Sequence, residues 1–113
     1  MAVLDAGGHL IAFERSDGAA PGRVAIATGK AYGAVMLGMA GRAPIGRAEQ
    51  QAYFLQAGDG ALPGQVVAVP GGVLIRDAKL NVVGAVGVTG DLSDNDEICA
   101  IAGVEATNLT AEA

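Results

Sequence analysis

The sequence has few of the side chains that form disulfides and bind metal ions. Its 113 residues include one cysteine, Cys99, one histidine, His9, and no tryptophan. A single cysteine cannot form a disulfide within the chain, and these two side chains alone do not complete a zinc site. The absence of a Cys-x-x-Cys-His segment excludes covalent haem attachment. This cysteine usage fits a reducing compartment.

Basic residues and long apolar runs are also scarce. Seven Lys and Arg are scattered among twelve Asp and Glu, which gives a net charge of −5. A nucleic-acid partner would need a basic stripe, so we expect none. No apolar run approaches the roughly 20 residues of a membrane span, and no charged segment precedes an apolar one as in a signal peptide. We therefore expect a cytoplasmic protein without a membrane partner.

Glycine and small apolar residues are abundant instead. Hydrophobic residues make up 51% of the chain, aromatic residues only 4%, and there are 18 glycines. The core must then consist of Val, Ile, Leu and Ala. The glycines lie among apolar residues, which indicates close backbone packing and tight turns rather than disorder. The length corresponds to one domain, residues 1–113.

Two similar segments predict β-hairpins. Residues 5–9 (DAGGH) combine an Asp that opens a turn with two Gly that permit positive φ, and apolar residues flank them at 2–4 and 10–13. A second Asp-Ala turn at Asp77 lies between expected strands 73–76 and 81–88. Together they indicate one antiparallel sheet, to which residues 66–69 (VVAV) would add a short strand.

Helices are expected between and after the hairpins. An apolar period near 3.6 covers residues 23–39, a shorter helix is plausible over 45–55, and 58–60 reads as loop. Asp94 and Glu97 form an acceptable capping pair for a last helix over 94–108, with Ile98, Ile101, Ala102 and Leu109 as its buried stripe. The order of elements indicates an α+β fold, a sheet of about five antiparallel strands with helices packed on it.

Few residues are candidates for chemistry. His9 is a potential haem or metal ligand, or simply a polar residue beside a turn. Cys99 is either a nucleophile that uses His9 as its base or a small buried hydrophobe, and we favour the second. Exposed backbone N–H groups at the Pro70-Gly71-Gly72 turn form either an anion site or part of a purely structural turn. Lys30 is either a solvated charge or a pocket cation, and no P-loop surrounds it. No catalytic residue is assigned.

Five segments together resemble one family. They are residues 3–10 (VLDAGGHL), 29–32 (GKAY), 70–73 (PGGV), 83–90 (VGAVGVTG) and 96–103 (DEICAIAG). In this order they resemble the GlcG/HbpS-like haem-binding proteins, a group that also supplies the C-terminal domain of PduO-type cobalamin adenosyltransferases. The resemblance implies a profilin-like α/β fold, assembly into dimers to octamers, and haem binding by some members.

The sequence departs from that family in two places. Members usually carry an amphipathic helix before the first strand, which is missing here, and Leu74 stands where Pro often follows Gly-Gly-Val. A missing helix would leave apolar surface for a neighbouring subunit to cover. We therefore expect a homodimer or a larger even-numbered oligomer. The alternative is a misassigned start or a truncated chain.

These observations lead to one main hypothesis and two alternatives. The main hypothesis is a small homo-oligomeric binding protein for haem or a related tetrapyrrole, with Lys30 and Pro70–Gly72 facing the ligand pocket. His9 would be the iron ligand, and Met36, Met39 and Cys99 would be softer substitutes. The first alternative is an enzyme or accessory protein of small-molecule catabolism that holds a compact carboxylate with Lys30 and Pro70–Gly72. The second is a structural oligomer without a ligand.

Overall fold

The computed structural model describes the backbone of residues 1–50 and 52–113, and their side chains except those of 45, 47, 48, 50, 52, 55 and 59. The strands are β1 (Ala2–Asp5), β2 (Leu10–Phe13), β3 (Gly72–Arg76), β4 (Val82–Gly87) and β5 (Thr110–Glu112). The helices are α1 (Arg23–Leu37), α2 (Ala43–Gln50), α3 (Ala52–Ala61) and α4 (Ser93–Glu105).

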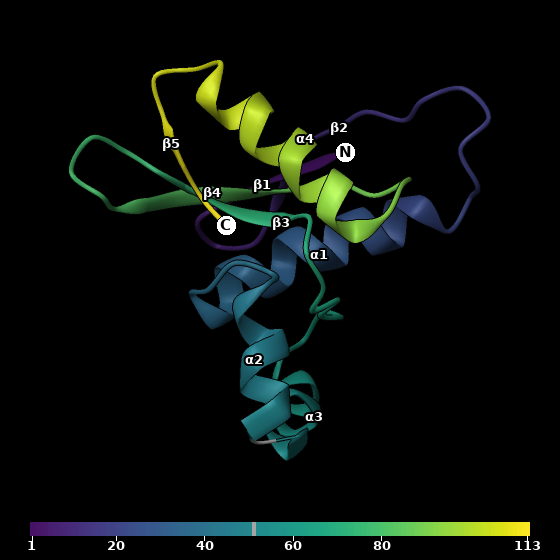
Figure 1. The fold of residues 1–113 in the computed structure, drawn as a ribbon, viewed down its shortest axis with the longest axis vertical. Helices are drawn as coiled ribbons and strands as arrows, with labels where there is room; N and C mark the ends of the chain where they lie inside the picture. The colour runs from purple at the N-terminus through teal and green to yellow at the C-terminus, as the bar shows by residue number, and fades with distance from the viewer. Residues whose placement is uncertain (51) are drawn as a thin grey trace.

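The strands form one antiparallel sheet in the order β2-β1-β4-β3-β5. Helix α1 covers one face of this sheet and α4 the other, while α2 and α3 extend away from the α1 face (Figure 1). The predicted α+β class and the joining of both hairpins in one sheet are therefore confirmed. Because β1 pairs with β4, the two hairpin turns lie at the same end of the sheet.

Each face of the sheet has its own small core. Toward α1, the core contains Leu4, Leu74 and Ala85 with alanines of the helix, and toward α4 it contains Val73, Val86 and Val104. Small residues allow α1 to lie very close to the strands. A Cβ placed on Gly87 would lie 2.0 Å from the backbone oxygen of Ala27. This contact explains how a protein with few aromatic residues fills its interior.

The strand expected at residues 66–69 is not formed. This segment crosses the outside of α1, where the Val67 N–H donates to the Gly29 oxygen, and where Val66 and Val67 pack over Gly33 and Gly29. Its apolar residues cover a helix instead of joining the sheet. The fifth strand is β5, which we did not expect because Thr110–Glu112 directly follows the region assigned to the last helix.

The helical boundaries differ from the prediction in the middle of the chain. Residues 45–55 were expected to form one helix, and the described residues there belong to both α2 and α3. Gly58-Asp59-Gly60, expected to be loop, lies within α3. Helix α1 ends at Leu37, where Gly38 adopts a φ of 65°.

The predicted buried face of α4 is wrong. Ile98, Ala102 and Leu109 are exposed and Ile101 is partly buried, whereas the helix buries Asp96, Glu97, Ala100 and Val104. Cys99, which we expected to be buried, is exposed. The Asp94/Glu97 capping pair is also absent, since the N-cap residue Leu92 makes no side-chain cap. Asp94 and Glu97 bind Arg42, and Asp96 binds Lys30. These ion pairs allow α4 to bury Asp96 and Glu97, while Asp94 stays exposed.

Candidate functional site

His9 lies in the turn between β1 and β2, which the Asp5 carboxylate organises. Asp5 Oδ1 accepts the backbone N–H groups of Gly7 and His9 at 2.9 Å each, and it lies 3.3 Å from His9 Nδ1. The N–H of His9 is the main cause that lowers the pKa of Asp5 below its ordinary value. The His9 side chain is 82% exposed. The turn thus displays an imidazole on a negatively charged support.

The inner side of this turn packs against α1. Gly8, with a φ of 84°, packs closely against the methyl group of Met36 and the ring of Tyr32. The Tyr32 hydroxyl accepts the N–H of Gly64 at 3.0 Å, which fixes the ring. Met36 is therefore the sulfur-containing side chain that reaches the turn carrying His9.

Asp5 Oδ1 lies beside Nδ1 of His9 and leaves Nε2 away from the carboxylate. When Nδ1 donates its proton to Asp5 Oδ1, Nε2 carries the lone pair. A carboxylate on the other ring nitrogen is the support that metal-ligating histidines commonly have, because it fixes the tautomer and raises the basicity of the ligand. In chemical terms His9 is suited to bind a metal ion through Nε2.

Lys30 is buried and paired. Its ammonium donates to the Val88 carbonyl at 2.9 Å and to Asp96 Oδ2 at 3.0 Å, and the Lys30 and Asp96 side chains are 2% and 4% exposed. Lys30 is therefore not a solvated charge, whereas its place in a ligand pocket stays a prediction. Asp96 was missed, although a buried lysine needs a carboxylate and three acidic residues follow closely in the first turns of α4.

The Pro70-Gly71-Gly72 turn packs directly on this ion pair. Gly71, with a φ of 111°, leaves room for the ammonium, since a Cβ there would lie 2.8 Å from Lys30 Nζ. The Gly71 oxygen accepts the N–H of Val88, and the Gly72 oxygen accepts the N–H of Gly41. Lys30, Pro70, Gly71 and Gly72 therefore form one buried cluster. We expected them to share one ligand site with His9, but His9 lies at the opposite end of β4.

Arg42 forms a second charged cluster with α4. Its Nε and Nη2 donate to Glu97 Oε1 at 3.1 and 2.9 Å, and Nη2 also donates to Asp94 Oδ1 at 2.5 Å. The hydrogen bond to Glu97 is the main reason that the pKa of Arg42 is raised. Among the described residues, Glu97 Oε2 is buried without a hydrogen-bond partner. No motif in the sequence pointed to Arg42.

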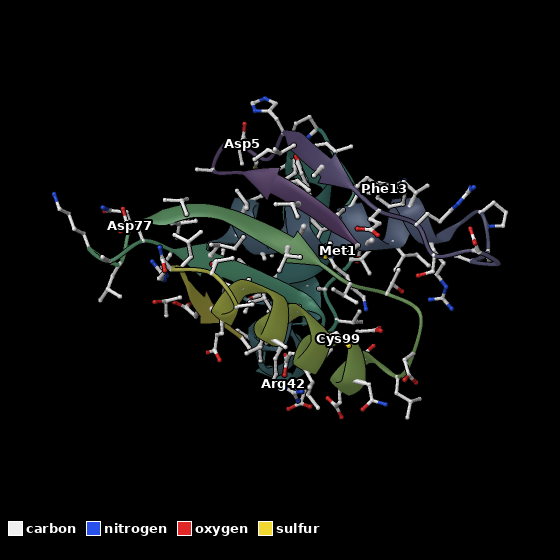
Figure 2. All side chains as sticks on the ribbon, turned by 90° about the horizontal axis from the view of Figure 1, so that it is seen from above. Met1, Asp5, Phe13, Arg42, Asp77 and Cys99 are labelled. Carbon is white, nitrogen blue, oxygen red and sulfur yellow. The ribbon has the colours of Figure 1, made fainter. Side chains whose placement is uncertain are left out.

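Two pockets open near the chain start. One of about 450 Å³ lies between the loop after β2 and the start of α1, where Arg15, Arg23 and Thr89 line it and Arg23 Nη1 donates to Thr89 Oγ1 at 2.8 Å. The other, about 320 Å³, is an apolar groove beside α4 lined by Val3, Val86, Cys99 and Gly103 among others. Figure 2 shows Asp5 and Asp77 at the two hairpin turns, away from Met1, Phe13 and Cys99.

The fold and these sites define a small α+β protein with a glycine-rich buried ion pair and an exposed, carboxylate-supported histidine. The chain belongs to the HbpS-like family: a model of that family, described as haem degrading protein HbpS-like, matches residues 1–105. A double mutant of Streptomyces reticuli HbpS is 31% identical, with a TM-score of 0.78, over 93% of this chain and 68% of that one.

Two further crystal structures share the fold. A PduOC:heme complex has a TM-score of 0.85 at 23% identity over 99% of this chain and 80% of that chain. Klebsiella pneumoniae protein ORFY has a TM-score of 0.78 at 24% identity over 92% of this chain and 70% of that chain. A comparison with curated protein sequences gave no match. Among the described residues, no helix is long and apolar enough to cross a membrane.

Proposed function

We propose that this chain is a small homo-oligomeric protein that binds haem or a related tetrapyrrole. The HbpS-like family and the similarity to the fold of the PduOC:heme complex support a haem-related ligand. Within the chain, the proposal depends on His9. One exposed imidazole, held through Nδ1 by Asp5, is the observation that carries it.

The residues around His9 fit an iron porphyrin. Haem iron takes an imidazole as an axial ligand, and the porphyrin face prefers apolar contacts. Leu10 and Ile11 follow His9 directly, and both are exposed. Met36 is the softer substitute that contacts the same turn, whereas Cys99 lies on α4 beside the apolar groove. We assign iron ligation to His9 Nε2 and hydrophobic contact to Leu10 and Ile11.

Lys30 and Pro70–Gly72 enter this proposal as support for the fold around the ligand. The ammonium already has a carbonyl and a carboxylate as partners, and the two glycine oxygens already accept N–H groups. The cluster joins α1, β4 and α4. We propose that it keeps these elements in place while the ligand binds at the other end of the sheet.

A second candidate function is the binding of a compact carboxylate. The pocket of about 450 Å³ favours it, because Arg15 and Arg23 line this pocket and the Arg23 guanidinium is fixed by Thr89. Guanidinium groups match carboxylates in geometry and charge. Glu14 and Asp17 line the same pocket and oppose an anion, which makes this the weaker candidate.

Titration of the purified protein with haemin tests the main proposal. We expect a Soret band that saturates at one haem per chain and that apomyoglobin removes slowly. Absorbance that keeps rising in proportion to added haemin would contradict specific binding. Calorimetry with small dicarboxylates on the same preparation tests the second candidate, for which saturable heat is the expected result.

A further inference from the structure

An apolar strip runs along β2 on the face of the sheet that α1 covers. Leu10 and Phe13 pair with Leu4 and Ala2 of β1, and both of these partners belong to the core under α1. Cross-strand partners point to the same face of a sheet, so Leu10 and Phe13 lie on this face as well. They are nevertheless 54% and 38% exposed, because α1 packs on β1, β3 and β4 and leaves the outermost strand uncovered.

Different chemical groups lie at the two ends of this strip. At one end is the turn that carries His9, which packs against Met36 near the end of α1. At the other end is the pocket of about 450 Å³, which Phe13, Arg15 and Arg23 line. Arg23 is also the first residue of α1. Helix α1 and strand β2 therefore run in opposite directions between the same two ends.

The two guanidinium groups of this pocket are accessible to an anionic ligand. Arg23 Nη1 donates to the uncharged hydroxyl of Thr89 at 2.8 Å, and neither Arg15 nor Arg23 takes part in the ion pairs among the described residues. Glu14 and Asp17 line the same pocket and oppose a free anion. A carboxylate ligand that also gains apolar contact along the strip overcomes this opposition better than a small anion does.

We infer that this pocket binds the propionate carboxylates of a haem whose iron is held by His9, an assignment that rests on the haem binding proposed above. Haem has its iron at the centre of an apolar ring and both carboxylates on one edge. An imidazole, an apolar strip and two guanidinium groups follow one another along β2 in the order that this ligand requires. Arg15 lies six positions after His9, so their Cα atoms are at most about 22 Å apart, a span that two side chains and the ligand bridge together.

The two ends of the strip act on different parts of the ligand, which makes their effects separable. His9 acts on the iron and therefore on the position of the Soret band. Arg15 and Arg23 act on the carboxylates, so their removal should weaken binding and leave the Soret maximum of the bound haem in place. Haemin dimethyl ester has no ionised carboxylate for a guanidinium to bind. Its affinity should therefore not depend on either arginine, which makes the two arginines specificity residues.

Titrations with haemin and with haemin dimethyl ester test this assignment. We expect Arg15→Gln/Arg23→Gln to bind haemin about tenfold more weakly than the wild type with an unchanged Soret maximum, and to bind the ester as the wild type does. Arg15→Gln alone should show part of this loss, and it touches no contact of the fold. Lys79→Gln is the matched control, since it removes a cation at the other hairpin, and it should bind both ligands like the wild type.

The outcomes separate this assignment from the proposed function. Haemin binding that neither the arginines nor esterification weakens would overturn the assignment and leave haem binding itself intact. An equal loss of affinity for haemin and for the ester in the double variant would also overturn it, because the effect would then not involve the carboxylates. A wild type that binds neither ligand would overturn the proposed function and this assignment together. Circular dichroism confirms that each variant is folded.

Discussion

Lys30 and Asp96 show how strongly two residues can constrain this small fold. Two charges removed almost completely from water are costly unless each satisfies the other. Here the ammonium also meets the Val88 carbonyl, and Asp96 Oδ1 accepts the N–H of Asp91 at 3.0 Å. The pair therefore ties α1 to the exit of β4 and to the start of α4.

Removing one partner should destabilise the protein severely. We expect Lys30→Met to lower the free energy of unfolding by about 3–5 kcal/mol, because Asp96 is left buried without its counter-ion. The double variant Lys30→Met/Asp96→Leu should recover much of this loss. Urea unfolding followed by circular dichroism measures both, with Lys79→Met as the exposed control. A single variant within about 0.5 kcal/mol of the wild type, the range of ordinary surface changes, would contradict a buried pair.

At the scale of elements, the two hairpin turns are built alike. In each turn, an Asp carboxylate accepts hydrogen bonds from the backbone N–H groups two and four residues later. Asp5 accepts those of Gly7 and His9, and Asp77 accepts those of Lys79 and Asn81. The positive φ falls on Gly8 in the first turn and on Leu80 in the second. Asn81 occupies the place of His9, so the backbone design alone does not require a histidine there.

These turns make the protein sensitive to acid. Backbone N–H groups of His9 and Asn81 lower the pKa values of Asp5 and Asp77 in the folded state. As the pH falls, these two carboxylates therefore bind protons in the unfolded chain before they do so in the folded protein. Their contribution to the free energy of unfolding is complete above about pH 5 and is lost as the pH falls through about 4 and below.

The double variant Asp5→Asn/Asp77→Asn should show a weaker loss of stability between about pH 5 and pH 2 than the wild type. Thermal melts across this range measure the difference in slope. The single variant Asp17→Asn, in the loop before α1, serves as the control and should follow the wild type. Identical slopes for the wild type and the double variant would contradict the role of these carboxylates.

Because α1 packs very closely on β4, we expect glycine substitutions there to destabilise the protein. Gly87→Ala would place a methyl group 2.0 Å from the backbone oxygen of Ala27, so we expect a loss of about 3 kcal/mol. Gly103→Ala in α4 meets open space and should stabilise the helix by about 0.5–1 kcal/mol. Chemical denaturation compares them, and equal effects of the two substitutions would show that α1 does not approach the sheet so closely.

Local patterns allowed the hairpins, α1 and the fold class to be predicted, because turns and helical periodicity depend on residues that are close in sequence. The strand predicted at 66–69 was wrong because this continuous apolar run covers Gly29 and Gly33 of α1, a contact that depends on distant packing. The face of α4 was wrong because apolar periodicity took no account of ion pairs with Lys30 and Arg42. The family resemblance placed Lys30 and Pro70–Gly72 at one ligand site with His9. Lys30 and the glycine turn do lie together, but His9 lies at the other end of β4, and Asp96 was not predicted.

At the scale of the whole molecule, two different regions lie at opposite ends of the sheet. The buried ion pair and the glycine turn lie where β4 ends, and the turn that carries His9 lies at the end where β4 begins. An apolar groove beside α4 and the free edge of β2 remain open along the sheet. One end therefore stabilises the fold, while the other presents an imidazole for which the turn itself has no structural need.

The most direct measurement is a haemin titration of the wild type and His9→Asn, followed at the Soret band. Asn is the residue that the second turn uses at the equivalent position, so the variant should keep its fold, and Asn81→Ala is the matched control. We predict that His9→Asn shifts the Soret maximum and weakens haemin binding by about tenfold or more, a loss of at least about 1.4 kcal/mol, while Asn81→Ala binds like the wild type. An unchanged spectrum and affinity in His9→Asn would contradict iron ligation by His9.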